Sequence, residues 1–400
     1  MKIKENQYNY IFITALVFLS IILIFVANSL SVSYKEALNV LDNSSVLSYI
    51  TKISMVIFGQ NDIAIRLPFI IFYILSSILM YLLTKDYFSK ESDRVLNILI
   101  FMILPGMLSA ALLINSAILV TFCTLLYLYY YKFHQKHNYY LLAIFLFVDN
   151  SFAILFLALF FYSLRKKENK LLVVSLVLFT LSMYIYGFSS DGKPRSYLLD
   201  TFAIYASIFS PLLFVYYFYS MYRVAIKGKH SIFWYISITA LVFSFLFSFR
   251  QKIYIEDFAP YVIITLPVML KIFLHTLRIR LPEFRKIHYN LAKLTISLLL
   301  LNSFLTLYNK PLYLFIQNPE KHFVYDYHFA KEIAEVLKKN NINNIKTFDK
   351  KLEKRLEFYG IKKGNEYLVS LKNPTTYDVK FTIEYMKKDL IDIYVYKIRE

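Results

Sequence analysis

Residues 58–83 read FGQNDIAIRLPFIIFYILSSILMYLL, and this stretch is the clearest indication of the fold. Its first part carries polar and charged side chains, among them Asp62 and Arg66. The run Pro68–Leu83 carries no charge, and its length approaches the roughly 17–25 apolar residues with which a helix crosses a bilayer. Proline is well tolerated at the first position of a helix, where its missing N–H would have no partner. The stretch therefore predicts a membrane-spanning helix that begins at Pro68 and is entered from a polar loop.

Comparable apolar runs recur on both sides of this stretch. They are Tyr10–Leu30, Val95–Ile114, Ala117–Tyr131, Tyr139–Leu164, Leu171–Phe188, Thr201–Met221, Ile232–Phe249, Ala259–Leu277 and Leu294–Tyr308. The composition agrees, because 58% of the 400 residues are hydrophobic and only 18% are charged. Soluble domains average about 45–50% apolar residues and about 25% charged residues. The chain is thus predicted to be a polytopic membrane protein, which excludes a soluble enzyme, a disordered chain and a nucleic-acid-binding domain.

The positions of the basic residues predict which loops lie inside. Lys and Arg are frequent in cytoplasmic loops, and here they concentrate at residues 2–4, 85–94, 132–136, 165–170, 223–229 and 278–293. With these loops inside, residues 31–67 and everything after Tyr308 lie outside. In a bacterial host, which we assume, the chain would be in the inner membrane and the outside would be the periplasm.

The run Tyr139–Leu164 is interrupted at its centre by Asp149 and Asn150, and both of its ends are basic. We predict two short helices that meet at this pair and fold back as a hairpin, which is tolerated where protein or a watery cavity surrounds it. The alternative is one straight span with a polar residue facing a neighbour. With the hairpin, the chain makes about 11 crossings.

The tail after the last span differs in kind. We expect residues 1–308 to form an all-α polytopic membrane domain and residues 309–400 a small α+β domain outside the membrane. Helices are predicted at Tyr327–Asn340 and Lys350–Tyr359, strands at Asn344–Phe348, Tyr367–Leu371, Val379–Met386 and Leu390–Ile398, and a hairpin turn at Lys387–Asp389.

The first outer loop, residues 31–67, is the most informative segment for function. An acidic residue, Glu36, follows closely on the first span. The stretch Ala37–Phe58 has the spacing of apolar residues typical of an amphipathic helix that lies in the membrane interface.

This order of features resembles glycosyltransferase family 39. A first span, an outer loop with an acidic residue just after that span, an interfacial helix and the string at residues 58–68 carry the resemblance, which covers roughly residues 10–165. The family includes protein O-mannosyltransferases and lipid A aminoarabinose transferases, which have the multi-spanning GT-C architecture. The resemblance implies that a sugar passes from a polyprenyl-phosphate carrier to an acceptor on the outer face.

The resemblance also implies a base in the first outer loop, and we assign that role to Glu36. A carboxylate can remove the proton of an acceptor hydroxyl. The family usually has an Asp-Glu pair here, whereas this chain has Lys35 and Glu36. The lysine could bind the carrier phosphate. A solvated loop glutamate paired with Lys35 or Lys52 is the alternative interpretation of Glu36.

A departing phosphate needs cations, and the outer basic residues are the candidates. Predicted phosphate ligands are Lys35, Arg66, Lys193, Arg195 and Arg250, and predicted cavity-lining residues are Tyr34, Asp149, Asn150, Asp257 and Tyr261. Each has a structural alternative. Arg66 and Arg250 could anchor helix ends, the Ser190–Arg195 segment could be an ordinary turn, and Asp149 with Asn150 could hold the hairpin together.

No metal and no cofactor beyond the lipid-linked donor are expected. The chain has one cysteine, Cys123, and seven scattered histidines, without a zinc-binding spacing. The expected partners are a lipid-linked sugar, membrane lipids and an acceptor that is a glycan, a lipid or a protein, with no nucleic acid. Two other functions remain open: an inactive envelope-assembly scaffold, and a carrier for a lipid-linked substrate.

Overall fold

The computed structural model describes residues 2–187, 193–228, 230–372 and 377–398. The chain forms two compact units. The bundle unit contains Met1–Leu23 and Phe69–Thr306, and the sheet unit contains Ile24–Pro68 and Leu307–Glu400. The first outer loop thus packs in the same unit as the C-terminal tail. The predicted boundary between residues 308 and 309 lies beside the Thr306–Leu307 junction.

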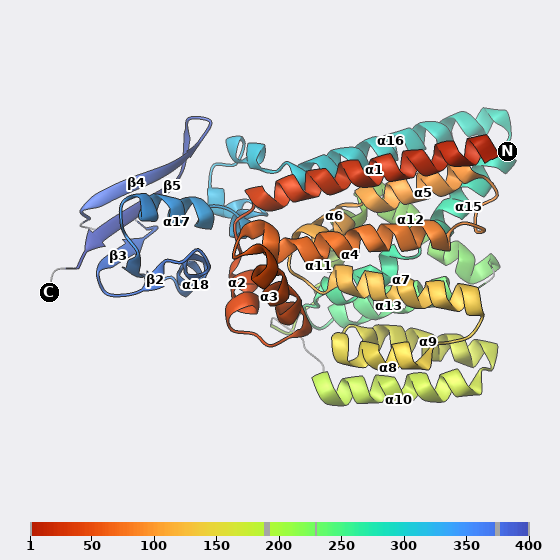
Figure 1. The fold of residues 1–400 in the computed structure, drawn as a ribbon. Helices are drawn as coiled ribbons and strands as arrows, with labels where there is room; N and C mark the ends of the chain where they lie inside the picture. Colours follow the sequence, from red (N-terminus) through yellow and green to blue (C-terminus); the bar gives the residue numbers. More distant parts are fainter. Residues whose placement is uncertain (1, 188–192, 229, 373–376, 399–400) are drawn as a thin grey trace. The chain divides into compact units, whose positions relative to one another are not determined.

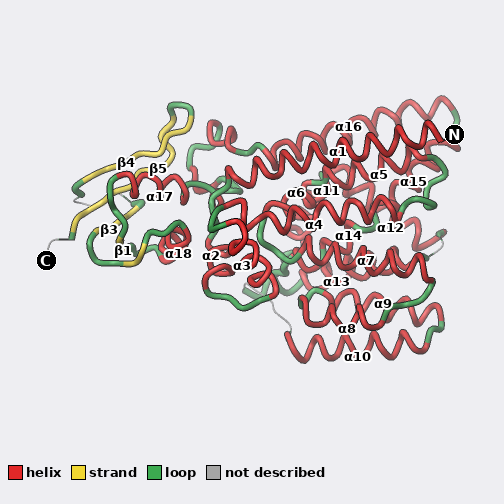
Figure 2. Tube along the Cα trace, in the orientation of Figure 1, coloured by secondary structure: helices red, strands yellow, loops and turns green. Residues whose placement is uncertain are grey.

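The described part of the bundle unit is all-helical (Figures 1 and 2). Its helices are α1 (Lys2–Ser29) and α4 (Asp62–Leu83), which both continue into the sheet unit, then α5 (Glu91–Ile103), α6 (Pro105–Leu112), α7 (Ala117–His134), α8 (Tyr139–Val148), α9 (Phe152–Lys166), α10 (Asn169–Tyr186), α11 (Leu198–Phe209), α12 (Pro211–Lys227), α13 (Ile232–Ser248), α14 (Ala259–Ile263), α15 (Leu266–Ile279) and α16 (Pro282–Leu307). A 3₁₀ turn, Ile255–Asp257, precedes α14.

Several of these helices are long and apolar enough to cross a membrane. Among the described residues there are five such helices, or up to seven if each of two bent helix pairs counts as one span. The predicted multi-pass, all-α character is therefore confirmed, while the number of crossings stays a prediction.

The hairpin predicted at Asp149 and Asn150 is present. α8 ends before this pair and α9 begins just after it. The far ends of the two helices meet, because His137 Nε2 lies 3.1 Å from Glu168 Oε2. At the tip, the rings of Phe145 and Phe152 stack with their centroids 4.6 Å apart.

Two predicted spans are wrong as single straight helices. The run Thr201–Met221 is divided between α11 and α12, which bend by 105°, and the run Val95–Ile114 between α5 and α6, which bend by 50°. Each second helix begins with a proline, Pro211 or Pro105. Proline has no N–H to donate and disfavours helical geometry in the residue before it, so each break falls there.

The predicted single interfacial helix, Ala37–Phe58, is also two helices, α2 (Tyr34–Leu41) and α3 (Val46–Phe58). Polar residues separate them, and the Ser45 hydroxyl accepts a hydrogen bond from Ser48 N at 3.2 Å, which caps α3. Short polar side chains favour such caps over helix interiors, and this preference ends the helical run here.

Helix α4 begins at Asp62, so the expectation that Pro68 opens the span is wrong. Inside a helix, Pro68 cannot donate a hydrogen bond to the carbonyl of Ala64. The hydroxyl of Ser54 on α3 donates to that carbonyl instead, at 2.5 Å. The proline is tolerated because a neighbouring helix supplies the missing donor.

The C-terminal part of the sheet unit has the predicted α+β composition (Figure 2). It contains 3₁₀ turns at Lys310–Leu314, Pro319–Lys321 and Tyr325–Tyr327, helices α17 (Ala330–Lys339) and α18 (Lys350–Phe358), and strands β1 (Asn344–Lys346), β2 (Lys362–Lys363), β3 (Tyr367–Ser370), β4 (Val379–Tyr385) and β5 (Lys388–Lys397). The sheet order is β2-β1-β3-β5-β4; β1 is parallel to β2 and β3, and the other pairs are antiparallel.

The core of this part is apolar, with Leu337, Leu356 and Val369 all buried. Its β4–β5 turn differs from the prediction. Tyr385 pairs directly with Lys388, so the turn is Met386 and Lys387, both with positive φ. The predicted turn, Lys387–Asp389, is wrong because Lys388 and Asp389 already pair in the strand.

Candidate functional site

Glu36, the predicted base, lies in the first turn of α2, where it closes a capping box. Its backbone N–H donates to Ser33 Oγ at 3.3 Å, and its Oε2 accepts from the backbone N–H of Ser33 at 2.9 Å. Such reciprocal bonds satisfy two N–H groups that a helix start leaves without partners. The side chain is only 2% exposed.

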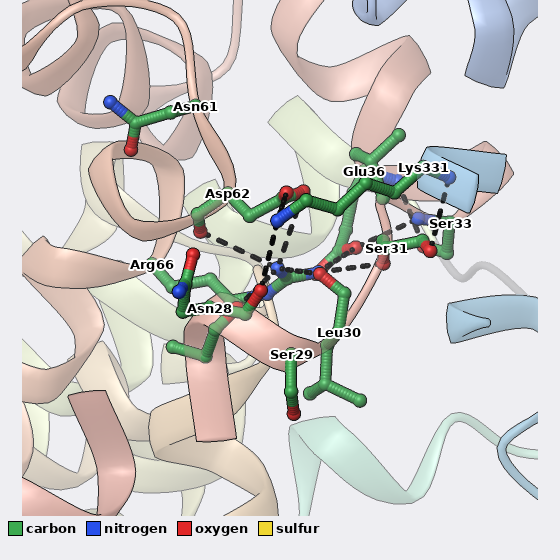
Figure 3. A network of polar contacts seen from close by, with 12 residues as sticks. Asn28, Ser29, Leu30, Ser31, Ser33, Glu36, Asn61, Asp62, Arg66 and Lys331 are labelled. Carbon is green, nitrogen blue, oxygen red and sulfur yellow. Dashed lines mark hydrogen bonds and ion pairs between the residues drawn. The ribbon is translucent and has the colours of Figure 1, made fainter. Parts of the chain in front are cut away.

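The Arg66 guanidinium lies beside Glu36 and is fully buried (Figure 3). Nη2 donates to Glu36 Oε2 at 3.1 Å and to the Ser31 carbonyl at 2.9 Å. Nη1 donates to the carbonyls of Ala27 (3.1 Å), Leu30 (2.9 Å) and Asp62 (3.4 Å). Arg66 thereby joins the end of α1, the start of α2 and the start of α4. Its Nε is buried and bonds none of the described atoms.

A second carboxylate, Asp62, completes this cluster. Its Oδ1 lies 3.8 Å from Arg66 Nη1, and its Oδ2 lies 3.1 Å from Lys331 Nζ (Figure 3). The Tyr359 hydroxyl donates to Oδ1 at 2.5 Å. Burial, followed by the charge of Asp62, raises the pKa of Tyr359, so the phenol keeps its proton. We call Glu36, Arg66, Asp62, Lys331 and Tyr359 the buried charge cluster.

The two residues before Glu36 are more accessible. Tyr34 is half-buried and Lys35 is exposed on the first turn of α2. Lys35 therefore presents a cation at the surface of the sheet unit. It directly precedes Glu36, a member of the buried charge cluster.

The hairpin tip in the bundle unit collects four predicted cavity residues. The Tyr261 hydroxyl donates to the Ser151 carbonyl at 3.0 Å and so holds the tip in place. Asn150 and Asp257 line one pocket. Burial, reinforced by the nearby charges of Asp149 and Glu256, raises the pKa of Asp257 to about 7. A carboxyl with this pKa can exchange a proton at neutral pH.

The predicted outer cations of the bundle unit lie on two adjoining segments. The backbone N–H of Arg195 donates to the Arg250 carbonyl at 3.2 Å. The Arg195 guanidinium lies over the Tyr197 ring, 4.7 Å from its centroid, and the Tyr197 hydroxyl donates to the Lys193 carbonyl. The side chains of Lys193, Arg195 and Arg250 are exposed. Residues 190–192 of the predicted loop, and Phe188 at the end of the predicted span, lie outside the described residues.

The predicted site residues thus form two sets. Tyr34, Lys35, Glu36 and Arg66 belong to the sheet unit, and the other predicted residues belong to the bundle unit. Within the described ranges, no group of three or more His, Cys, Asp or Glu side chains is arranged to hold a metal ion.

Sequence reasoning missed three members of the buried charge cluster. Asp62 lies four residues before Arg66 on one helix, a spacing that brings opposite charges together and could have identified it. Lys331 and Tyr359 lie about 270 or more positions further along the chain than Asp62, so spacing carries no signal for them.

Comparison with known proteins agrees with the predicted resemblance. Residues 42–153 match the model of the family described as dolichyl-phosphate-mannose-protein mannosyltransferase. ArnT from Cupriavidus metallidurans in the apo state has a similar structure, with a TM-score of 0.55 and 9% sequence identity, over 98% of each chain. A search of curated proteins finds no match.

The GT-C-like membrane glycosyltransferase fold predicted from the sequence is therefore confirmed. At 9% identity, the likeness to ArnT establishes the fold and not the substrates.

Proposed function

We propose that this chain is an inner-membrane glycosyltransferase that moves a sugar from a polyprenyl-phosphate donor to an acceptor hydroxyl on the periplasmic face. The observation that carries the proposal is the likeness to ArnT over 98% of both chains, which includes the C-terminal sheet as well as the helices. The family match over residues 42–153 supports the same reaction class.

In the proposed reaction, Glu36 takes the proton of the acceptor hydroxyl. The hydroxyl oxygen then attacks the anomeric carbon of the sugar, and the bond from that carbon to the phosphate oxygen breaks. The phosphate leaves with the electron pair of that bond. Arg66 acts as a positioning residue, because its Nη2 holds Glu36 Oε2 at 3.1 Å. The prediction that Arg66 also binds the donor phosphate stays a prediction, and its side chain is fully buried.

Lys35 in the sheet unit, and Lys193, Arg195 and Arg250 in the bundle unit, are exposed cations and stay the predicted phosphate ligands. Guanidinium groups bind phosphate through paired, charge-assisted hydrogen bonds, which strengthen as charge accumulates on the leaving oxygen. Fixed cations can do this work without a metal ion.

A second candidate function is an inactive scaffold with the same fold. The enclosure of Glu36 in the capping box and in the ion pair with Arg66 favours it, because both contacts are structural. So does Lys35, which stands where the family usually has an aspartate.

The transferase is tested with membranes that contain the full chain and with polyprenyl-phosphate sugars extracted from the native host and radiolabelled in the sugar. We expect transfer of label by the wild type and a loss of about tenfold or more in Arg250→Ala, since a lost charge-assisted contact costs about 1.5–3 kcal/mol. Lys227→Ala, which removes an exposed cation at the end of α12, serves as the matched control. Absence of transfer from every lipid fraction by folded protein would favour the scaffold.

A further inference from the structure

The bundle unit contains a cavity of about 490 Å³ bounded by α5, α12, α15 and α16. Most of its wall is apolar, with Leu96 and Ile100 from α5, Leu212 from α12, Leu270 and Phe273 from α15, and Leu291 from α16. A volume of this size and an apolar lining are typical of a ligand site rather than of a packing defect.

One part of the wall is polar and basic. Arg280, His288 and Thr276 line the cavity there, together with the phenols of Tyr216 and Tyr219. Arg280 follows the last residue of α15, in the short connection to α16. The cavity therefore has an apolar body and a cationic border, which is the chemistry of a site for an amphiphile with a negative head group.

The arginines around this border differ in how they are satisfied. Arg278 donates to the Asp93 carboxylate at 2.6 Å, and Arg223 donates to the Thr276 hydroxyl at 2.8 Å. Arg280 lines the cavity and makes no ion pair among the residues that the structure describes. Arg285 donates to the Arg280 carbonyl at 3.1 Å and so brings another positive charge close to it.

We propose that this cavity binds an anionic phospholipid of the surrounding bilayer, with an acyl chain along the apolar wall and the phosphate at Arg280. A guanidinium charge without an ion pair at the wall of a cavity attracts an anion, and phosphate oxygens accept charge-assisted hydrogen bonds from its terminal N–H groups. His288 also lines the cavity, and its Nδ1 lies 3.1 Å from the Phe284 carbonyl oxygen. The site contains none of the residues assigned to sugar transfer, so it stands independently of the proposed function.

The test is native mass spectrometry of the purified full chain, released from detergent after addition of phosphatidylglycerol. We expect a bound lipid in the wild type and about tenfold weaker binding in Arg280→Ala. Lys286→Ala is the matched control, because Lys286 is an exposed cation on α16 that does not line the cavity. Equal loss in both variants would show a general effect of surface charge and would overturn the site.

A second variant probes the apolar part. Ala292 lines the cavity on α16, and Ala292→Phe would occupy the space assigned to the acyl chain. We expect it to displace phosphatidylglycerol while the thermal unfolding temperature stays within a few degrees of the wild type. Retention of the lipid by folded Ala292→Phe or Arg280→Ala protein would contradict the proposal. A third experiment uses inorganic phosphate in place of the lipid. If free phosphate binds as tightly as the lipid, and this binding depends on Arg280, the cavity is an ion site and not a lipid site.

Discussion

Arg66 is the residue with the largest number of polar contacts in the sheet unit's buried charge cluster. Removal of the guanidinium in Arg66→Ala would leave two carboxylates, Glu36 and Asp62, buried near each other. Loss of one partner from a buried ion pair costs about 3–5 kcal/mol. We expect a large drop in the thermal unfolding temperature of the purified protein, with Lys286→Ala as an exposed-cation control. An unfolding temperature equal to that of the wild type would contradict the assigned role.

His328 predicts a pH dependence of the sheet unit. Its Nδ1 and the Tyr313 hydroxyl lie 2.8 Å apart in the core, and burial, followed by the charges of Lys310, His322 and Arg355, lowers the pKa of His328 from 6.5 to about 3. The folded state therefore holds a neutral ring, while the unfolded state binds a proton below about pH 6.5. The resulting stability is present above pH 6.5 and is lost as the pH falls toward 3, by up to about 1.4 kcal/mol per unit.

Hydrogen exchange of α17 measures this effect. After correction for intrinsic exchange rates, we expect weaker protection at pH 5 than at pH 7.5. His328→Gln should reduce the dependence, because glutamine cannot take up a proton, and the part that remains is expected from His322, whose pKa burial also lowers. Equal protection at both pH values in the wild type would show that the histidine does not control this region.

Only part of the buried charge cluster could be predicted from the sequence. The resemblance and the outer location drew attention to Glu36 and Arg66, yet their ion pair could not be predicted. It depends on the path of the chain through α2 and α3 to the start of α4, which brings residues 30 positions apart to 3.1 Å. Lys331 was missed for the same reason, since its partner Asp62 lies in a distant part of the sequence.

At the element scale, the start of α4 depends on one hydrogen bond from another helix. Ser54→Ala would leave the Ala64 carbonyl without the donor that replaces Pro68, at a cost of about 1 kcal/mol. In Pro68→Ala, a backbone N–H becomes available to that carbonyl, so Ser54→Ala should cost less in this background. Thermal unfolding of both single variants and the double variant gives the coupling energy. Additive effects would show that the hydroxyl does not compensate for the proline.

The β4–β5 turn offers a stabilising change. Met386 and Lys387 adopt φ of 49° and 67°, a left-handed geometry that costs roughly 1–2 kcal/mol for ordinary residues. Two-residue hairpins with this geometry favour Asn-Gly. We expect Met386→Asn combined with Lys387→Gly to raise the unfolding temperature, and Met386→Ala, which keeps the strain, to leave it nearly unchanged. A lower unfolding temperature in the first variant would contradict the turn assignment.

Sequence patterns predicted the elements well where charge or strand alternation marked them. The α8–α9 hairpin followed from Asp149 and Asn150 between two basic loops, and β3, β4 and β5 followed from their alternating residues. The bend between α11 and α12 was not predicted, because residues 201–221 carry no charged side chain to mark a break. The one sequence signal for it, Pro211 after Ser210, also occurs in helices that are only kinked.

At the scale of the whole molecule, the grouping of segments into units was not visible in the sequence. Hydropathy separated a membrane part from a polar tail, but the sheet unit joins that tail to the first outer loop. The contacts that join them, such as that of Tyr359 with Asp62, are between single polar side chains and carry no periodic signal. The arrangement places Glu36 and the C-terminal sheet in one unit, so a change in either can affect the other.

Glu36→Gln tests the role of Glu36 as the base of a sugar transferase. Glutamine can keep the bonds to Ser33 N and Arg66 Nη2 but cannot take the proton from the acceptor. The measurement is the initial rate of label transfer from native polyprenyl-phosphate sugars, with thermal unfolding of the same preparations. We expect a rate at least 100-fold lower, in line with the roughly 10²–10⁴-fold contribution of a general base. The unfolding temperature should fall less than in Arg66→Ala, because the hydrogen bonds remain and Asp62 still lies near the guanidinium. Transfer at the wild-type rate by folded Glu36→Gln protein would contradict this role and leave Glu36 as a helix cap.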